Sequence, residues 1–182
     1  MTMCGIVGYI GTEQAAPIIL DGLSKLEYRG YDSAGMAIFD GEKINTRKAV
    51  GRLKVLENLT HGGENMKGTS GIGHTRWATH GAPSDINSHP HMNNAGTIAV
   101  VHNGIIENYI PLKKKMQDKG YQFISETDTE VLAHLLDYYY KGNPLEAITK
   151  VLHRVEGSYA LGIMFACLLY TSPSPRDRSV SR

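Results

Sequence analysis

Apolar residues along the chain fall into short continuous runs and into longer stretches with helical spacing. The run CGIVGYI at 4–10 is apolar and β-prone, and it predicts a buried strand that ends at Gly11. The runs AGMAIF and INTRKAV predict a hairpin, because the turn dipeptide Asp40-Gly41 lies between them. Similar runs predict further strands that begin at residue 70 or occupy 97–104 and 158–165.

The stretches with helical spacing predict helices between these strands. Ala15, Ile19, Leu23 and Leu26 recur on one face of a helix predicted over 12–30, which Gly30 ends. The other stretches predict a helix and loop over 51–70, a helix over 108–120 capped by Asn108, a helix over 131–142 behind a capping box of Thr127 and Glu130, and a helix over 145–155 behind Asn143-Pro144. This order of elements predicts antiparallel sheet covered by helices, an α+β layered domain.

Length and composition narrow the class of protein. The 182 residues, 41% hydrophobic and 20% charged, are typical of one globular domain with a substantial core. A formal net charge of +1 argues against nucleic acid as the main partner. Cys4 and Cys167 lie near opposite ends and do not indicate a disulfide framework, so we expect a cytoplasmic protein. No membrane partner is expected, because the sequence shows no membrane-length apolar run and no secretion signal.

Cys4 leaves two interpretations open. A cysteine without a disulfide is commonly a small buried apolar residue, and the Gly-Ile-Val-Gly run that follows fits this role. The alternative is a catalytic nucleophile, which requires that Met1 to Met3 be absent from the mature chain. A terminal α-amine titrates near pH ~8, so it can accept the thiol proton at neutral pH. Nucleophile and general base would then belong to one residue.

The dipeptide Asn103-Gly104 also has two interpretations. Asn-Gly is a favoured two-residue hairpin turn, so a turn is the simpler prediction. The functional hypothesis is an oxyanion hole, with a side-chain N–H from Asn103 and a backbone N–H from Gly104 aimed at a developing negative charge.

The segment TRWATHG concentrates polar and aromatic residues between glycines. Arg76 could be a surface charge and Trp77 a core residue. A guanidinium can also bind a carboxylate through two hydrogen bonds, with neighbouring hydroxyls adding donors. Asp128, near a predicted helix start, either stabilises the helix dipole or pairs with a substrate ammonium. Arg76 and Asp128 together would recognise the two charges of an amino acid.

Five histidines invite a metal-site hypothesis. Their spacing fits no familiar zinc pattern, and no HExxH motif or clear carboxylate triad accompanies them. We therefore predict no metal site, and we expect hydrogen bonds within the loop from His74, His80, His89, His91 and His102.

A set of motifs occurs here in one order, namely CGIVGYI, LEYRGYDSAG, GHTRWATHG, NSHPH, VHNGIIEN and SETDTEV. Over residues 3–165 they resemble the N-terminal glutaminase domain of the glutamine–fructose-6-phosphate aminotransferase family, which belongs to the class II glutamine amidotransferases. The resemblance implies an α+β fold, the four-layer αββα sandwich of the N-terminal nucleophile hydrolases.

The same resemblance implies a role for each candidate residue. Met3 matches an initiator methionine that is removed, which leaves Cys4 as the N-terminal nucleophile. It further implies that Asn103 and Gly104 form the oxyanion hole and that Trp77 is a mobile gate on the ammonia path. The groups that hold the α-carboxylate and α-amino groups of glutamine would be Arg76, Thr79, His80 and Asp128.

The implied chemistry has two steps and needs no metal or organic cofactor. The Cys4 thiolate attacks the side-chain amide of L-glutamine to give a γ-glutamyl thioester and ammonia, and water then releases glutamate. In the full enzyme, which is expected to be a homo-oligomer, a sugar-isomerase domain uses the ammonia to convert fructose 6-phosphate to glucosamine 6-phosphate.

The resemblance stops near Phe165, and the sugar-isomerase domain is missing. We therefore expect residues 3–165 to be a C-terminally truncated amidotransferase domain. Residues 166–182 are rich in Ser, Arg and Pro and predict a disordered or artefactual tail. Two alternatives remain, a stand-alone N-terminal nucleophile amidase and a catalytically inactive structural fragment.

Overall fold

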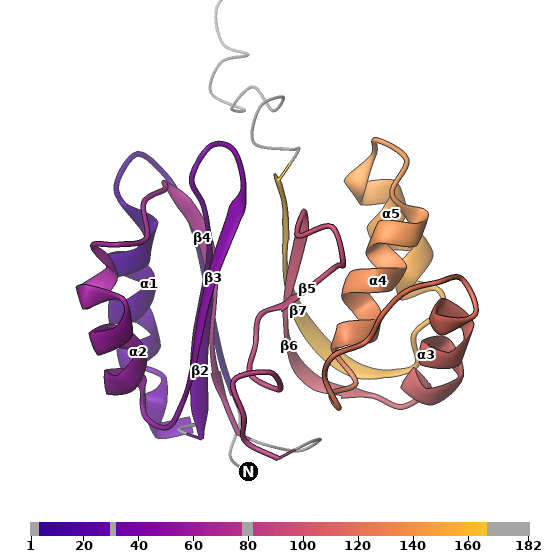
Figure 1. The fold of residues 1–182 in the computed structure, drawn as a ribbon, viewed down its shortest axis with the longest axis horizontal. Coiled ribbons are helices and arrows are strands. Elements are labelled where there is room, and N and C mark those ends of the chain that lie inside the picture. Colours follow the sequence, from indigo (N-terminus) through magenta and orange to yellow (C-terminus); the bar gives the residue numbers. More distant parts are fainter. Residues whose placement is uncertain (1–3, 30–31, 78–81, 167–182) are drawn as a thin grey trace, which may run out of the picture.

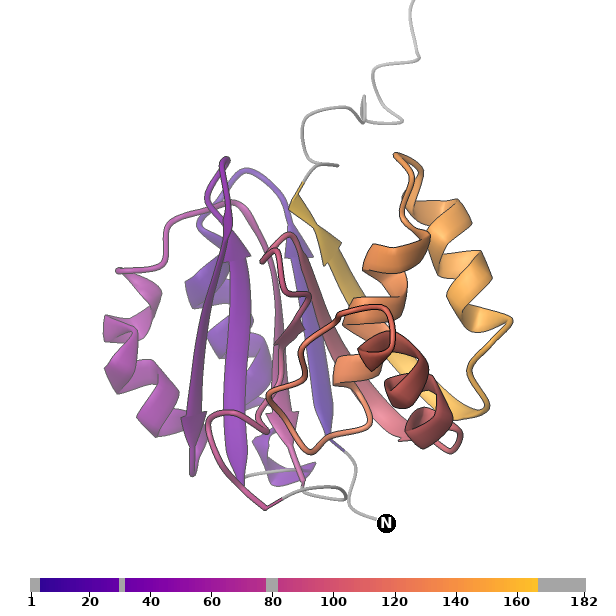
Figure 2. The same cartoon turned by 45° about the vertical axis from the view of Figure 1, so that its right-hand side comes forward.

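Two β-sheets lie face to face between two layers of helices (Figure 1). The computed structural model describes residues 4–29, 32–77 and 82–166. Turning the molecule by 45° keeps the helices on the outside and the sheets in the middle (Figure 2). Gly30 and the tail from residue 167 onward, both part of the predictions above, lie outside the described residues.

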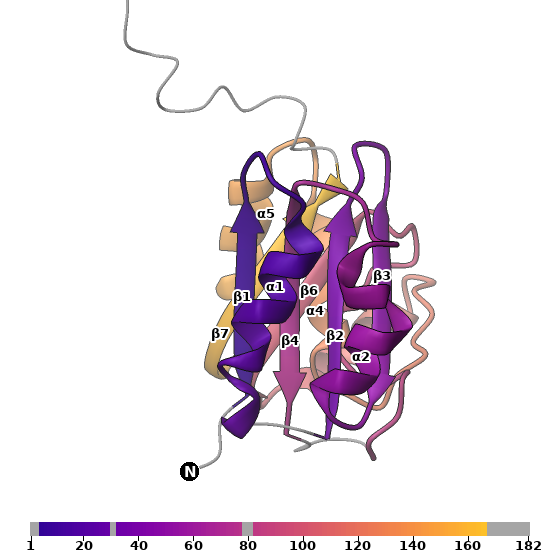
Figure 3. The ribbon, with the colours of Figure 1, turned by 90° about the vertical axis from the view of Figure 1, so that its left-hand side faces the viewer.

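The first sheet comes from the N-terminal half of the chain. Its strands stand in the order β1-β4-β2-β3 and each neighbouring pair is antiparallel. Helices α1 and α2 cover its outer face (Figure 3). The bounds are β1 (Gly5–Ile10), α1 (Ala15–Ser24), β2 (Ser33–Phe39), β3 (Ile44–Val50), α2 (Leu53–Leu59) and β4 (Ser70–Arg76), with short 3-10 helices at Glu27–Arg29 and His61–Gly63.

The second sheet has the order β5-β6-β7, again antiparallel, with three helices on its outer face (Figure 1). The two-residue strand β5 has no counterpart among the predicted elements. The bounds are β5 (His91–Met92), β6 (Ile98–Ile106), α3 (Tyr109–Gln117), α4 (Glu130–Tyr139), α5 (Pro144–Leu152) and β7 (Gly157–Phe165).

Apolar side chains fill the three spaces between the four layers. Ile19 and Leu23 of α1 pack against the first sheet, as their helical spacing predicts. Leu132 and Leu135 of α4 belong to the cluster beneath the second sheet. A third cluster lies between the sheets, where both contribute buried apolar residues, Ala37, Phe39, Ile44, Ile72, Ala99, Val101 and Met164. Each layer is therefore held by the apolar face that its residue pattern presents.

Two local predictions differ from the structure. The strand at 4–10 is not fully buried, because β1 is an edge strand of its sheet and Ile10 is 75% exposed. Asn108 precedes α3, but its side chain bonds to the backbone of Arg154 and Glu156 instead of capping the helix. At Asn108 tertiary contacts outcompete the local pattern, and at β1 the position at the edge of the sheet leaves Ile10 exposed.

The predicted capping box is also wrong in detail. Helix α4 begins at Glu130, so Thr127 lies outside its N-cap and bonds to the ring of His91 at 3.0 Å. The Glu130 carboxylate accepts N–H bonds from Ile124 and Ser125. The helix start at Asn143-Pro144 is confirmed, since the Asn143 side chain accepts the N–H of Glu146.

Helix α1 lies directly on the glycines of β4, which yields a stability prediction. A Cβ at Gly73 would lie 2.4 Å from Ile19 Cγ2 and 3.0 Å from Leu23 Cδ1. Gly73→Ala should therefore lower the free energy of unfolding by about 1–3 kcal/mol through overpacking. Gly8→Ala is the matched control, because a Cβ there meets no atom within 4 Å. Denaturant unfolding compares the two, and a Gly73→Ala protein as stable as the control would contradict this close packing.

Candidate active site

Cys4 stands at one end of the first sheet, beside the end of β4. The register of β1 pairs Gly5 with Thr75, and the Gly5 N–H donates to the Thr75 hydroxyl at 3.2 Å. Because the two strands are antiparallel, Cys4, which precedes Gly5, lies beside the residues that follow Thr75. The backbone N–H of Trp77 donates to the Cys4 sulfur at 3.1 Å. The half-buried thiol is thus held by backbone geometry and not by a side-chain base.

Its surroundings keep the thiol protonated. Burial raises the pKa of Cys4, and the negative charge of Asp32 adds to this rise. The N–H bond from Trp77 and the positive charge of Arg76 act in the opposite direction but do not cancel it. Since the thiolate is the nucleophile, Cys4 needs a general base in order to react at neutral pH.

Asn103 belongs to the second sheet and reaches across to Cys4. Its amide Nδ2 donates to the Cys4 carbonyl oxygen at 2.8 Å. The hairpin-turn interpretation of Asn103-Gly104 is wrong, because β6 continues through both residues to Ile106 and pairs with β7. Polar groups from two sheets therefore meet beside the thiol.

Gly104 occupies a position in β6 that excludes a side chain. Its φ is +126°, in the region that favours glycine. A Cβ there would lie 1.9 Å from the Ser158 carbonyl oxygen of the neighbouring β7. Glycine therefore allows the backbone to adopt this conformation beside Asn103 while β6 stays paired with β7.

Arg76 and Asp128 come from different sheets. Arg76 is the last residue of β4 and is 5% exposed, and its charge acts on the Cys4 thiol. Asp128 is 4% exposed and lies just before α4, where its Oδ2 accepts the N–H of Ile106 at 2.8 Å. This bond ties Asp128 to β6, two residues beyond Gly104.

The remaining candidates are placed only in part. Trp77 is 38% exposed, so the interpretation of it as a core residue is wrong. Thr79 and His80 lie outside the described residues. The structure thus brings Trp77 and Asn103 each into direct contact with Cys4.

Of the five histidines, the four that the structure describes, His74, His89, His91 and His102, form a buried cluster and not a set of loop contacts. The rings of His74 and His89 lie 4.3 Å apart, and those of His89 and His91 lie 4.9 Å apart. His102 bonds to the Thr129 hydroxyl at 2.9 Å. The expected hydrogen bonds within the loop are therefore replaced by contacts between elements, because His74, His91 and His102 lie on β4, β5 and β6. Within the part of the chain that the structure describes, no group of three or more His, Cys, Asp or Glu residues could hold a metal ion.

Burial keeps His74, His89 and His91 uncharged at neutral pH. It lowers the pKa of His74 to about 4, although a hydrogen bond with Asn103 acts against the shift. The pKa of His89 is lowered well below its usual value by burial and by the neighbouring histidines. Burial and the charge of Lys48 lower the pKa of His91. Neutral imidazoles can each donate one hydrogen bond and accept another.

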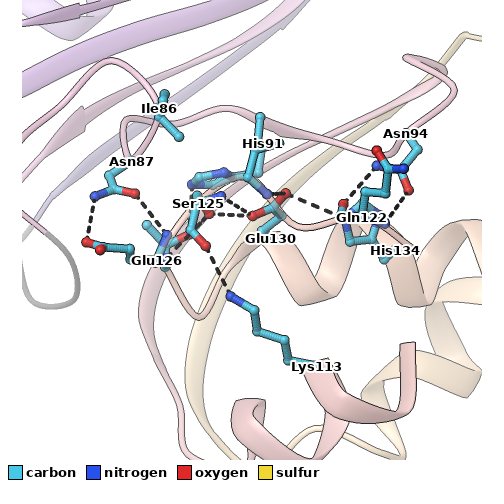
Figure 4. A network of polar contacts seen from close by, with 12 residues as sticks. Ile86, Asn87, His91, Asn94, Lys113, Gln122, Ser125, Glu126, Glu130 and His134 are labelled. Atoms are coloured by element: carbon cyan, nitrogen blue, oxygen red, sulfur yellow. Dashed lines mark hydrogen bonds and ion pairs between the residues drawn. The ribbon is translucent and has the colours of Figure 1, made fainter. Parts of the chain in front are cut away.

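A polar network fixes the segment that carries Asp128 (Figure 4). The Glu130 carboxylate accepts bonds from the Ser125 hydroxyl at 2.6 Å and from the Ser125 N–H at 2.7 Å. Lys113 of α3 donates to the Ser125 carbonyl at 3.1 Å, and Asn87 bonds to Glu126 from the other side. Residues 125–130 are thereby held between α3, α4 and the loop before β5.

The buried histidines predict a loss of stability in acid. Unfolded histidines bind protons below about pH 6.5, whereas His74 in the folded protein stays neutral down to about 4. The unfolded state therefore binds more protons in this window, and the free energy of unfolding should fall as pH falls, by about 1.4 kcal/mol per pH unit for each such histidine.

Denaturant unfolding at a series of pH values measures this slope. His89→Asn should reduce it, because an amide oxygen can replace Nδ1 as acceptor for the His102 N–H without taking up a proton. His61→Gln, at an exposed position outside the cluster, is the control and should leave the slope unchanged. A slope that His89→Asn does not alter would show that His89 is protonated in the folded state.

Comparison with known proteins relates this arrangement to one kind of domain. Residues 74–168 match the family model described as glutamine amidotransferase domain. A glutamine–fructose-6-phosphate aminotransferase [isomerizing] of Caldanaerobacter subterraneus subsp. tengcongensis is 67% identical over 162 residues, which cover 89% of this chain and 26% of that protein. The protein of the same name from Clostridium tetani is 65% identical, with the same coverage. The chain thus spans about a quarter of the length of these relatives.

A solved structure supports the same relationship through the fold. The glutamine phosphoribosylpyrophosphate amidotransferase of B. subtilis, in complex with ADP and GMP, superimposes with a TM-score of 0.76 at 33% identity. The match covers 88% of this chain and 35% of that one. The predicted α+β sandwich of the N-terminal nucleophile type is confirmed.

Proposed function

Because the chain belongs to the family of glutamine amidotransferase domains, we propose that it releases ammonia from the side-chain amide of L-glutamine through a thioester on Cys4. The observation that carries this proposal is the meeting of Cys4 with Asn103 across the two sheets, at 2.8 Å between Nδ2 and the Cys4 carbonyl. It places an amide donor beside a thiol that has a backbone N–H on its sulfur.

The first step forms the thioester. The α-amine of Cys4, exposed by removal of Met3, takes the thiol proton, and the sulfur attacks the amide carbon of glutamine. Nδ2 of Asn103 and the N–H of Gly104 stabilise the resulting oxyanion. The α-ammonium of Cys4 then gives this proton to the leaving nitrogen of the glutamine side chain, the C–N bond breaks, and ammonia departs.

The second step returns the enzyme to its starting state. Water, with its proton taken by the same α-amine, attacks the thioester carbon, and the C–S bond breaks to give glutamate and the thiol. The raised pKa of Cys4 supports a base of this kind, because the thiol does not ionise unaided at neutral pH.

The two ends of glutamine are assigned to residues on both sheets. Arg76, with Thr79 and His80, binds the α-carboxylate, and Asp128 binds the α-ammonium. Trp77 is the gate for ammonia, and its 38% exposure beside Cys4 suits a side chain that moves.

The wider role follows from the relatives' name. We propose that residues 3–165 are the glutaminase part of a cytoplasmic, homo-oligomeric glutamine–fructose-6-phosphate aminotransferase, in which another domain joins the ammonia to fructose 6-phosphate. The helices within the described ranges include none that is long and apolar enough to cross a membrane.

Exposure of the Cys4 amine is the first test. A protein that begins at Cys4 should hydrolyse glutamine and be labelled on Cys4 by a diazoketone analogue of glutamine, because its amine can take the thiol proton. The protein that retains Met1 to Met3 should lose the hydrolysis. Mass spectrometry establishes the N-terminus and the labelled residue, and Cys4→Ser gives the unlabelled control. Full glutaminase activity in a chain with an intact Met1 would contradict the role of the amine.

Charge recognition by Asp128 is the second test. Asp128→Asn keeps an oxygen for the Ile106 N–H but removes the charge that pairs with the substrate ammonium. The KM for glutamine should rise roughly 10–100-fold while kcat changes little, as expected for loss of one charged hydrogen bond. Glutaramate, which lacks the amino group, should distinguish little between the variant and the wild type.

The matched control is Asp118→Asn, at an exposed position after α3. Steady-state kinetics and thermal unfolding of both variants separate binding from folding. An unchanged KM in a folded Asp128→Asn protein would remove Asp128 from the substrate site.

A further inference from the structure

The side chain of His74 lies behind the Asn103 amide, on the far side from Cys4. Nε2 of His74 and Oδ1 of Asn103 are 2.8 Å apart, and Nδ2 of the same amide is 2.8 Å from the Cys4 carbonyl oxygen. We propose that His74 is a positioning residue that sets the orientation of the Asn103 amide, so that its N–H groups and not its oxygen face the nucleophile. This inference rests on the proposed function of Asn103 as an oxyanion donor.

The direction of each hydrogen bond follows from the groups involved. A backbone carbonyl can only accept, so the Asn103 atom next to the Cys4 carbonyl must be the nitrogen. The amide oxygen then faces His74 and can itself only accept. Nε2 of His74 must therefore carry a hydrogen. One tautomer of His74 thus fits one orientation of Asn103, and the Nδ1 tautomer would instead favour the flipped amide.

Two features hold the imidazole in this role. His74 is 1% exposed and lies on β4, with both neighbouring strands paired to it, so its backbone position is fixed by the first sheet. Its ring also packs against that of His89, with centroids 4.3 Å apart. Water does not reach such a ring to replace a lost hydrogen bond, so the contact between Nε2 of His74 and Oδ1 of Asn103 is kept by the packing around it.

The orientation matters because an amide has two different ends. With Nδ2 toward Cys4, one N–H binds the Cys4 carbonyl and the second can bind the oxyanion. With the amide flipped, Oδ1 would face the Cys4 carbonyl and the oxyanion, and both contacts would be repulsive. The expected loss is that of an oxyanion donor, which costs roughly 10²–10³-fold in kcat when the donor is removed outright.

A pair of variants of nearly equal shape tests this role. Gln can place an N–H close to the position of Nε2, whereas Met fills the same space without a donor. His74→Met should lower kcat for glutamine at least tenfold and leave KM within about twofold, since only the charge that develops during reaction is affected. His74→Gln should recover most of this loss. A purely structural role would instead make both variants fall together with thermal stability.

A double-mutant cycle connects the effect to Asn103. In an Asn103→Ala background, His74→Met should cause no further loss of kcat, because the amide that it orients is gone. Equal kcat values for His74→Met and His74→Gln would overturn the proposal. So would the same loss of kcat from His74→Met with and without Asn103.

The tautomer of His74 gives a readout that does not depend on activity. Nitrogen NMR of histidine-labelled protein should show His74 protonated on Nε2, with the signal assigned by its absence in His74→Gln. Protonation on Nδ1 would overturn the proposal whatever the kinetics show. If no glutaminase activity is found in a chain that begins at Cys4 and the Nε2 tautomer is present, the proposed function fails while the positioning of Asn103 stands. If His74→Met does not fold, the wild-type tautomer and His74→Gln still decide.

Discussion

The hydrogen bond from the Asn103 side chain to the Cys4 carbonyl joins the two sheets, and the candidate site depends on it. A sandwich of this kind is held mainly by apolar contacts between its layers, which set the distance between sheets but do not orient polar groups. The hydrogen bond from the Asn103 amide orients the polar groups at one end of the sandwich. Because it fixes Cys4 against β6, it also fixes Trp77, whose N–H bonds to the same residue's sulfur.

The change from apolar to polar along two strands locates the site. Alternate residues of a strand face the same side of its sheet. On β4 the inner face carries Ile72, which packs between the sheets, and then His74 and Arg76. On β6, Ala99 and Val101 of the same cluster precede Asn103. The inner faces of both strands thus change from apolar side chains to polar side chains at corresponding positions. This change can be recognised in the sequence once the two strands are known to face each other.

Other features could not be predicted because they depend on distant partners. The Asn103-Gly104 dipeptide has the composition of a turn, and it stays in a strand because β7, more than fifty residues later, pairs with it. The pattern of Thr127 and Glu130 is typical of a helix cap, but the ring of His91 provides a competing partner for Thr127. Motif resemblance indicated Cys4, Asn103 and Asp128, whereas nothing local indicated that His74 lies behind Asn103. Its contact requires two strands from different sheets.

The long sequence separation between Cys4 and its partners has a consequence for folding. The sulfur is bonded by a residue 73 positions later, and the carbonyl by a residue 99 positions later. Proteins dominated by such non-local contacts fold more slowly than helical ones, since a large loop must close before its contacts form. During synthesis at about 5–20 residues per second, Asn103 emerges roughly 5–20 seconds after Cys4. The N-terminal segment is therefore available to processing enzymes before the site has assembled. In the proposed mechanism, the order of synthesis would then separate exposure of the Cys4 amine from assembly of the site around it.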